Sequence, residues 1–152
     1  MHAQIAGERL GGLLLRLLIG ALFLAHLYWK IVVRPGGIAG WWDGLASAGY
    51  PSLVMVYVLC AEVAGALLVI PGVFARYVAI LAMPLMIGAS HFWLIRKGFY
   101  FTESGAELPL VWLALLCLQV VIGDGAFALL RSPDLGGIAA RLRIRRGFQP
   151  RA

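Results

Sequence analysis

The stretch G-G-L-L-L-R-L-L-I-G-A-L-F-L-A-H-L-Y-W-K-I-V-V, from Gly11 to Val33, decides the fold. It is apolar over about the 20 residues that an α-helix needs to cross a bilayer. Its leucines and alanines favour a helix over a strand. The run is too long for the apolar region of a signal peptide, and no small-residue cleavage site follows it. We therefore expect a transmembrane helix that remains in the protein.

The composition of the whole chain also indicates a membrane protein. Of its 152 residues, 62% are hydrophobic and 13% are charged. Ordinary soluble domains are roughly 45–50% hydrophobic and about 25% charged. A soluble chain of this length could not bury so much apolar surface, whereas lipid can solvate it. The length accommodates a single domain.

Three further apolar runs have a similar length. Together with the first span, at about residues 11–33, they predict spans over about residues 51–71, 74–95 and 107–130. Because so few residues separate the second and third spans, we expect these two helices to form a tight antiparallel hairpin. Between the first two spans, Trp41 and Trp42 suit a segment in the headgroup region. The predicted fold class is all-α: a polytopic four-transmembrane-helix bundle over residues 1–130.

The basic residues predict the orientation of this bundle. Four spans place both termini on one side of the membrane, and that side collects Arg9, Arg76, Arg131, Arg141, Arg143, Arg145, Arg146 and Arg151. The opposite side has Lys30, Arg34, Arg96 and Lys97. The positive-inside rule then places both termini in the cytoplasm, for a multi-pass protein of the inner (plasma) membrane. We expect the basic tail at 131–152, helical in part from Leu135 to Arg146, to face lipid phosphates, and we expect no nucleic-acid partner.

Eight ionisable side chains lie within the predicted spans or at their ends: Arg16, His26, Lys30, Glu62, Arg76, His91, Glu107 and Asp124. A charge at the centre of a span costs about 2.5–3.5 kcal/mol on insertion scales. On the first helix Arg16, His26 and Lys30 share one sector with Phe23, so we expect this sector to face the bundle interior. Near the cytoplasmic ends, Arg16, Arg76 and Asp124 are predicted to form structural ion pairs.

The other ionisable residues are expected to converge in the outer half of the membrane. Glu62 lies roughly 16 Å below Pro51 at 1.5 Å per residue, so it needs a basic partner or a bound proton. His26, Lys30 and His91 lie in the outer half, and Glu107 begins the fourth helix at the outer surface, where a carboxylate suits a helix N-terminus. The pattern predicts a polar funnel that opens outward and ends at Glu62.

This funnel has a functional and a structural interpretation. Imidazole groups can hydrogen-bond a quinone carbonyl, relay protons or bind a metal, but a plain hydrogen bond between helices would satisfy His26 and His91 as well. In the functional interpretation, Glu62, His26 and His91 are catalytic, Lys30 and Glu107 bind the substrate, and no metal is held.

The small residues of the spans carry weaker signals. Cys60 and Cys117 fit neither a disulfide framework nor a zinc-binding spacing, and single thiols in a membrane usually pack as small apolar side chains. The sequence leaves open whether the two lie near each other. Ala61 and Gly65, four residues apart beside Glu62, allow a neighbouring helix to approach closely.

Several of these residues together resemble the DoxX family. They are R-L-L-I-G-A-L-F-L-A-H-L-Y-W-K (Arg16 to Lys30), E-V-A-G-A-L-L-V-I-P-G-V-F-A-R (Glu62 to Arg76), G-Y-P (Gly49 to Pro51), Met83, Glu107 and G-D-G (Gly123 to Gly125). The resemblance covers about residues 12–127. It implies a four-helix inner-membrane protein linked to redox physiology, because some relatives are membrane subunits of thiosulfate:quinone oxidoreductase and others associate with thiol or oxidative-stress enzymes.

Three functions remain open from the sequence. The first is a membrane component of a redox system, with quinone-linked oxidation of a small reduced sulfur species. The second is a non-enzymatic membrane partner or assembly factor for another complex, and the third is a small transporter, although no span shows an interruption at mid-depth. The chain has no haem, nucleotide or iron–sulfur motif, so we expect no covalently bound cofactor. The expected partners are membrane lipid, quinone, a redox partner protein and a second copy of the chain.

Overall fold

The computed structural model describes residues 2–133, with side chains described from Gly7 onward. The helices, in chain order, are α1 (His2–Tyr28), η1 (Trp29–Val33), α2 (Gly37–Ser47), α3 (Ser52–Ala64), η2 (Gly65–Val69), α4 (Ala75–Lys97), η3 (Phe101–Glu103) and α5 (Glu107–Ile122). Over these residues the all-α prediction is confirmed, and the single β-type contact there is an isolated bridge between Val73 and Leu130. The helix predicted from Leu135 to Arg146 lies outside the described residues.

Within residues 2–133, three helices are long and apolar enough to cross a membrane. They run from Gly7 to Val33, from Ser52 to Val69 and from Ala75 to Lys97, close to the first three predicted spans. α5 is apolar but has only 16 residues, about 24 Å at 1.5 Å per residue. This length falls short of the roughly 30 Å hydrocarbon core.

The prediction that the last helix continues to residue 130 is wrong. α5 ends at Ile122, and the next residue, Gly123, has a φ of 84°. Glycine adopts this left-handed region at little cost and commonly ends helices. The chain then leaves the helix although Ala126 to Leu130 remain largely apolar, so the hydropathy pattern does not reveal the change.

Two of the long helices contain a π-helical turn that the sequence did not predict. η1 continues α1, and η2 continues α3 without a break. Such turns occur often at functional sites because they rotate the side chains that follow. Lys30 lies within η1, and Glu62 lies three residues before η2 begins.

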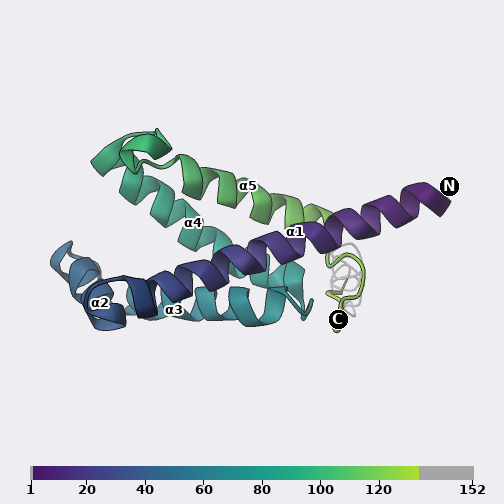
Figure 1. The fold of residues 1–152 in the computed structure, drawn as a ribbon, viewed down its shortest axis with the longest axis horizontal. Coiled ribbons are helices and arrows are strands. Elements are labelled where there is room, and N and C mark those ends of the chain that lie inside the picture. Colours follow the sequence, from purple (N-terminus) through teal and green to yellow (C-terminus); the bar gives the residue numbers. More distant parts are fainter. Residues whose placement is uncertain (1, 134–152) are drawn as a thin grey trace, which may run out of the picture.

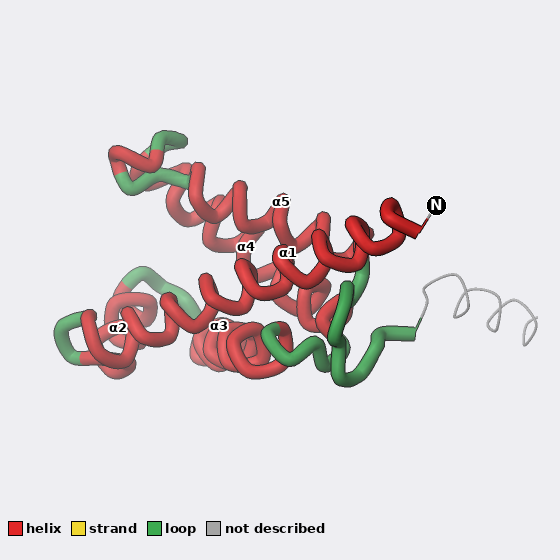
Figure 2. Tube along the Cα trace, turned by 45° about the vertical axis from the view of Figure 1, so that its right-hand side comes forward, coloured by secondary structure: helices red, strands yellow, loops and turns green. Residues whose placement is uncertain are grey.

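The helices form a bundle with two well-defined ends. α4 and α5 make an antiparallel hairpin, and α1 crosses the bundle against η2 and α5 (Figure 1). At one end, the first turns of α1, the α3–α4 turn and the segment after α5 meet: the Ala126 N–H donates to the Arg9 carbonyl, and the Leu130 N–H donates to the Gly72 carbonyl. The loops that hold α2 and η3 lie at the other end (Figure 2).

α5 runs alongside the full length of α4 once its flanking residues are included. At its start, the Glu107 N–H donates to the Phe99 carbonyl over 2.8 Å, just beyond the end of α4. After its end, the Asp124 carboxylate accepts a hydrogen bond of 3.1 Å from the Arg76 N–H, in the first turn of α4. The chain from Glu107 to Asp124 therefore passes from one end of α4 to the other.

The distribution of apolar side chains fits a lipid environment. The buried core is modest and includes Ile19, Phe23, Met55, Val69, Trp112 and Leu116. Many large apolar side chains point outward, among them Leu14, Leu24, Leu53, Leu67, Ile87 and Val121. An apolar surface of this extent is unusual for a soluble monomer and normal for a protein that lipid surrounds.

Candidate functional site

A buried ion pair joins the first long helix to the second. The Nζ atom of Lys30 lies 2.7 Å from Oε1 and 2.6 Å from Oε2 of Glu62, so the ammonium group donates to both carboxylate oxygens. Lys30 is 4% exposed and Glu62 is 2% exposed. The contact is a salt bridge in which both side chains are buried. It supplies the basic partner that a glutamate at this depth needs.

An aromatic ring covers the ammonium group of this pair. The Lys30 Nζ atom lies 4.1 Å from the ring centroid of Trp41, close enough for a cation–π interaction. Trp41 belongs to α2, and it is 7% exposed. The ammonium group is therefore enclosed between a carboxylate from α3 and an indole face from α2. The sequence suggested a headgroup role for Trp41, not contact with Lys30.

Close packing of α1 on η2 holds the two partners together. A Cβ atom on Gly65 would collide with the Phe23 ring, and one on Gly20 would collide with Ile70. The small residues at 61 and 65 therefore allow close approach, as the sequence predicted, and Phe23 fills the space. Arg16, Phe23 and Lys30 are buried and His26 is half-buried, so the predicted sector of α1 faces the interior.

His26 lies one turn before Lys30 and packs against α5. Its ring meets the Trp112 ring edge-on, with the centroids 4.8 Å apart, and Phe23 packs against the same indole at 4.8 Å. Trp112 is buried, and it therefore links the outer part of α5 to the sector of α1 that carries the ion pair. The sequence did not single out Trp112, because one tryptophan in an apolar run has no distinctive spacing.

The other two residues of the predicted funnel are not joined to the ion pair. His91 is exposed on α4 and makes no hydrogen bond or ion pair with any described residue. Glu107 accepts a hydrogen bond of 2.9 Å from the Phe101 N–H and so closes the loop that contains η3. In this structure Lys30 and Glu62 are enclosed, so the outward opening of the predicted funnel is covered.

The residues predicted as structural ion pairs lie together at the opposite end of the bundle. Arg16 donates from Nη1 to the main-chain carbonyl of Asp124 over 2.7 Å, not to its carboxylate. That carboxylate accepts from the Arg76 N–H and from the N–H and hydroxyl of Ser132. The arrangement ties α1, α4 and the segment after α5 together.

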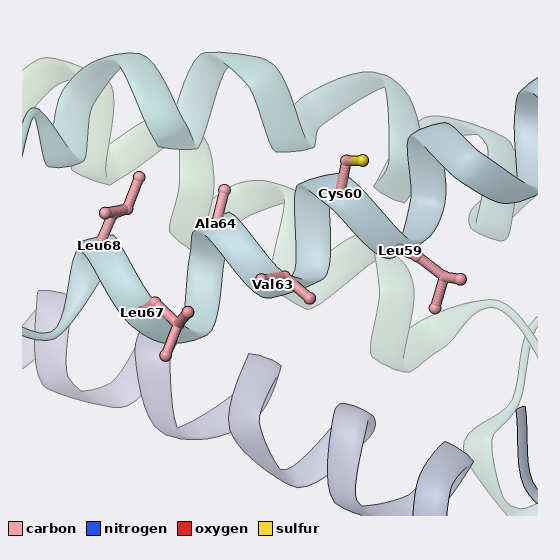
Figure 3. Close-up of a pocket in the computed structure, with 6 residues that line it drawn as sticks. All are labelled: Leu59, Cys60, Val63, Ala64, Leu67 and Leu68. Atoms are coloured by element: carbon pink, nitrogen blue, oxygen red, sulfur yellow. The ribbon is translucent and has the colours of Figure 1, made fainter.

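An apolar groove lies on the lipid-facing side of α3 and η2. It is lined by Leu59, Cys60, Val63, Ala64, Leu67 and Leu68 (Figure 3). In Figure 3, Cys60, Ala64 and Leu68 point to one side of the helix, and Leu67 points to the other. None of the predicted polar site residues lines it. Cys60 and Cys117 are both free thiols with exposed side chains.

The fold and site define a helical membrane protein with an ion pair buried between its first two long helices. A model of the DoxX family matches residues 11–95, which is more than half of the chain. The chain belongs to the DoxX family, whose members are membrane components linked to redox systems. No curated protein and no solved structure matches it. The matched region includes Lys30, Trp41 and Glu62, whereas α5 lies beyond it.

Proposed function

We propose that this protein is a four-pass inner-membrane component of a redox system, with both termini in the cytoplasm. The passage of α5 from one end of α4 to the other supports a fourth crossing, in which the residues flanking this short helix complete the span. Arg9, Arg76 and Arg131 lie at the end that holds the α3–α4 turn. The positive-inside rule favours the cytoplasm for that end.

The working site is the Lys30–Glu62 pair, and the observation that supports it is the enclosure of this pair beneath Trp41. Burying two charges costs several kcal/mol per ion, and hydrophobic residues of similar volume are often as stable. An ion pair that is no more stable than such hydrophobic residues suits a role in which its charges bind an ion or carry a proton. A small reduced sulfur anion, such as thiosulfate, binds the Lys30 ammonium group, and a lipid-soluble quinone accepts the electrons together with protons.

Charge balance then couples the anion to a proton. The enclosed site is neutral while Lys30 and Glu62 face each other. A thiosulfate dianion that approaches Lys30 brings two further negative charges, which are strongly disfavoured at this depth. Transfer of one proton to Glu62 lowers the net charge of the site from −2 to −1 and frees the ammonium group. Glu62 therefore exchanges a proton whenever an anion takes its place beside Lys30.

The remaining predicted residues have supporting roles in this proposal. His26 lies one turn from Lys30 and packs on Trp112, and in this proposal its imidazole passes a proton toward the pair. His91 is exposed on α4, where its imidazole can hydrogen-bond the carbonyl of a quinone that arrives through the lipid. Glu107 shapes the loop at the outer end.

Thiosulfate-dependent quinone reduction in membranes tests this function. Glu62→Gln keeps the shape of the side chain but removes its charge and its ability to carry a proton, so the activity is expected to fall by at least about tenfold, as for loss of an acid–base group. The control is Glu103→Gln, which changes an exposed glutamate in η3. Wild-type membranes without activity, or a Glu62→Gln variant with full activity, contradict the proposal.

A non-enzymatic assembly partner is the second candidate, and the enclosed state of the ion pair favours it. In that case the pair only sets the helix packing, and the basic tail recruits another protein. Deleting residues 134–152 would abolish function while leaving Ser132 bonded to Asp124, and Glu62→Gln would be tolerated. The two variants therefore separate the two functions.

A further inference from the structure

α2 is a short amphipathic helix that lies across the end of the bundle. Its inner face carries Trp41, Trp42 and Leu45, which are buried or half-buried, at the spacing of one helical face. Its outer face carries Ala39, Asp43 and Ser47, which are all exposed. α2 contacts η1 and α3, the two elements next to the ion pair. It therefore separates Lys30 from the outer aqueous phase.

Glycine turns flank α2 on both sides. Gly36, just before the helix, and Gly37, its first residue, have φ angles of 77° and 57°, and Gly49, after the helix, has a φ of 85°. At the C-terminal side the Tyr50 N–H donates to the Leu45 carbonyl and the Gly49 N–H to the Ala46 carbonyl, which is a Schellman ending. Helices between such turns can move as a unit, because a few backbone angles absorb the change.

The contact between Trp41 and Lys30 is the polar link from α2 to the site. The ring lies 4.1 Å from the ammonium nitrogen, and the ammonium group is otherwise held by Glu62 alone among the described residues. Trp41 thus takes the position that water or an anion would occupy if the site were open. Displacing α2 would expose the ammonium group without requiring any movement of α3.

We propose that α2 is a gate over the Lys30–Glu62 pair and that Trp41 is the latch that holds it closed. This proposal depends on the proposed function in one respect, because it takes the Lys30–Glu62 pair as the functional site. When α2 swings outward on its flanking glycine turns, the Lys30 ammonium group becomes accessible from the outer aqueous phase. When it closes, Trp41 covers Lys30 and excludes water.

Chemical labelling of lysine tests the gate directly, because the chain contains only Lys30 and Lys97. The protein in lipid nanodiscs, which leave both faces open, is treated with the water-soluble amine reagent trinitrobenzenesulfonate, and each lysine peptide is followed by mass spectrometry. Lys97 is exposed and serves as an internal control. In the wild type, Lys30 should react far more slowly than Lys97.

Trp41→Ala is expected to speed the labelling of Lys30 about tenfold, equivalent to about 1.4 kcal/mol, with no change at Lys97. Trp41→Phe keeps an aromatic face and should lie between wild type and Trp41→Ala. Asp43→Ala, on the outer face of the same helix, should leave the rate unchanged. Equal labelling of both lysines in the wild type, or the same Lys30 rate in Trp41→Ala, overturns the gate. Because the readout is labelling, an absence of redox activity does not affect it.

Discussion

Lys30 and Glu62 belong to residue types that usually lie at protein surfaces, and this chain buries them between its first two long apolar helices. Each would be costly alone at this depth. The bidentate contact of 2.6 and 2.7 Å lets each charge compensate the other, and Trp41 adds a polarisable face. The two side chains therefore depend on each other, and this dependence can be measured.

Replacing one partner of the ion pair with an apolar residue should destabilise the protein strongly. Glu62→Leu leaves a buried ammonium group without its carboxylate, so the free energy of unfolding should fall by about 3–5 kcal/mol. Thermal unfolding in detergent checks the loss. Glu103→Leu, at an exposed site in η3, should change the midpoint little; equal midpoints for the two variants would argue against a buried pair.

At the scale of residues, the sequence predicted that Glu62 needs a basic partner but did not predict every residue that encloses the ion pair. Glu62 was expected to require a base, and Lys30 was placed in the same outer half of the membrane. Trp41 was missed because its contact depends on how α2 folds back over η1, which no periodicity in residues 34–50 reveals. The roles of His91 and Glu107 stay predictions, since neither is bonded to the pair.

At the scale of the helices, the close contact between α1 and η2 depends on two glycines, Gly20 and Gly65. Gly65→Ala would place a methyl carbon 2.3 Å from a carbon of the Phe23 ring, so we expect a loss of about 1–3 kcal/mol in the free energy of unfolding. Gly88→Ala is the matched control, because a Cβ atom there meets nothing within 4 Å. Thermal unfolding of both variants measures the difference, and a Gly65→Ala variant as stable as Gly88→Ala would contradict this packing.

The Asp124 carboxylate is one of several groups that hold the segment after α5 to the bundle. Asp124→Ala removes the acceptor for the Arg76 N–H and for Ser132, so we expect about 1–3 kcal/mol of destabilisation. Protease cleavage after Arg131 should also become faster, because the segment is released. Asp43→Ala removes an exposed carboxylate from α2 and should change neither quantity. Unaltered cleavage in Asp124→Ala would show that other contacts hold the segment.

At the scale of elements, the length of the apolar runs predicted which segments are helical better than it predicted the residues at which the helices end. The first three spans agree with the structure because lipid-crossing helices need long apolar runs. The end of α5 was misplaced because Gly123 ends the helix by its backbone angle while the chain stays apolar. The π turns η1 and η2 were missed because a single extra residue per turn barely alters the apolar pattern.

For the whole molecule, the fourth crossing can be tested by labelling cysteines in intact cells. In a background with Cys60 and Cys117 changed to serine, Thr102→Cys in the η3 loop should react with a membrane-impermeant maleimide. Arg131→Cys should react only after the cells are permeabilised. Both sites are exposed, so burial does not limit either reaction. Labelling of both from the same side would show that α5 does not cross.

The all-helical membrane fold could be predicted because the hydropathy pattern acts over the whole chain. The enclosure of the site could not, because it depends on a small helix, α2, folding over the end of the bundle. The central claim is that the enclosed Lys30–Glu62 pair serves function and not packing alone.

The double variant Lys30→Met/Glu62→Leu tests that claim most directly. Replacing both charges with apolar groups of similar volume should preserve or raise the thermal stability, because no unpaired charge remains. The account predicts a folded protein that has lost thiosulfate-dependent quinone reduction. A stable double variant that retains wild-type activity would contradict it.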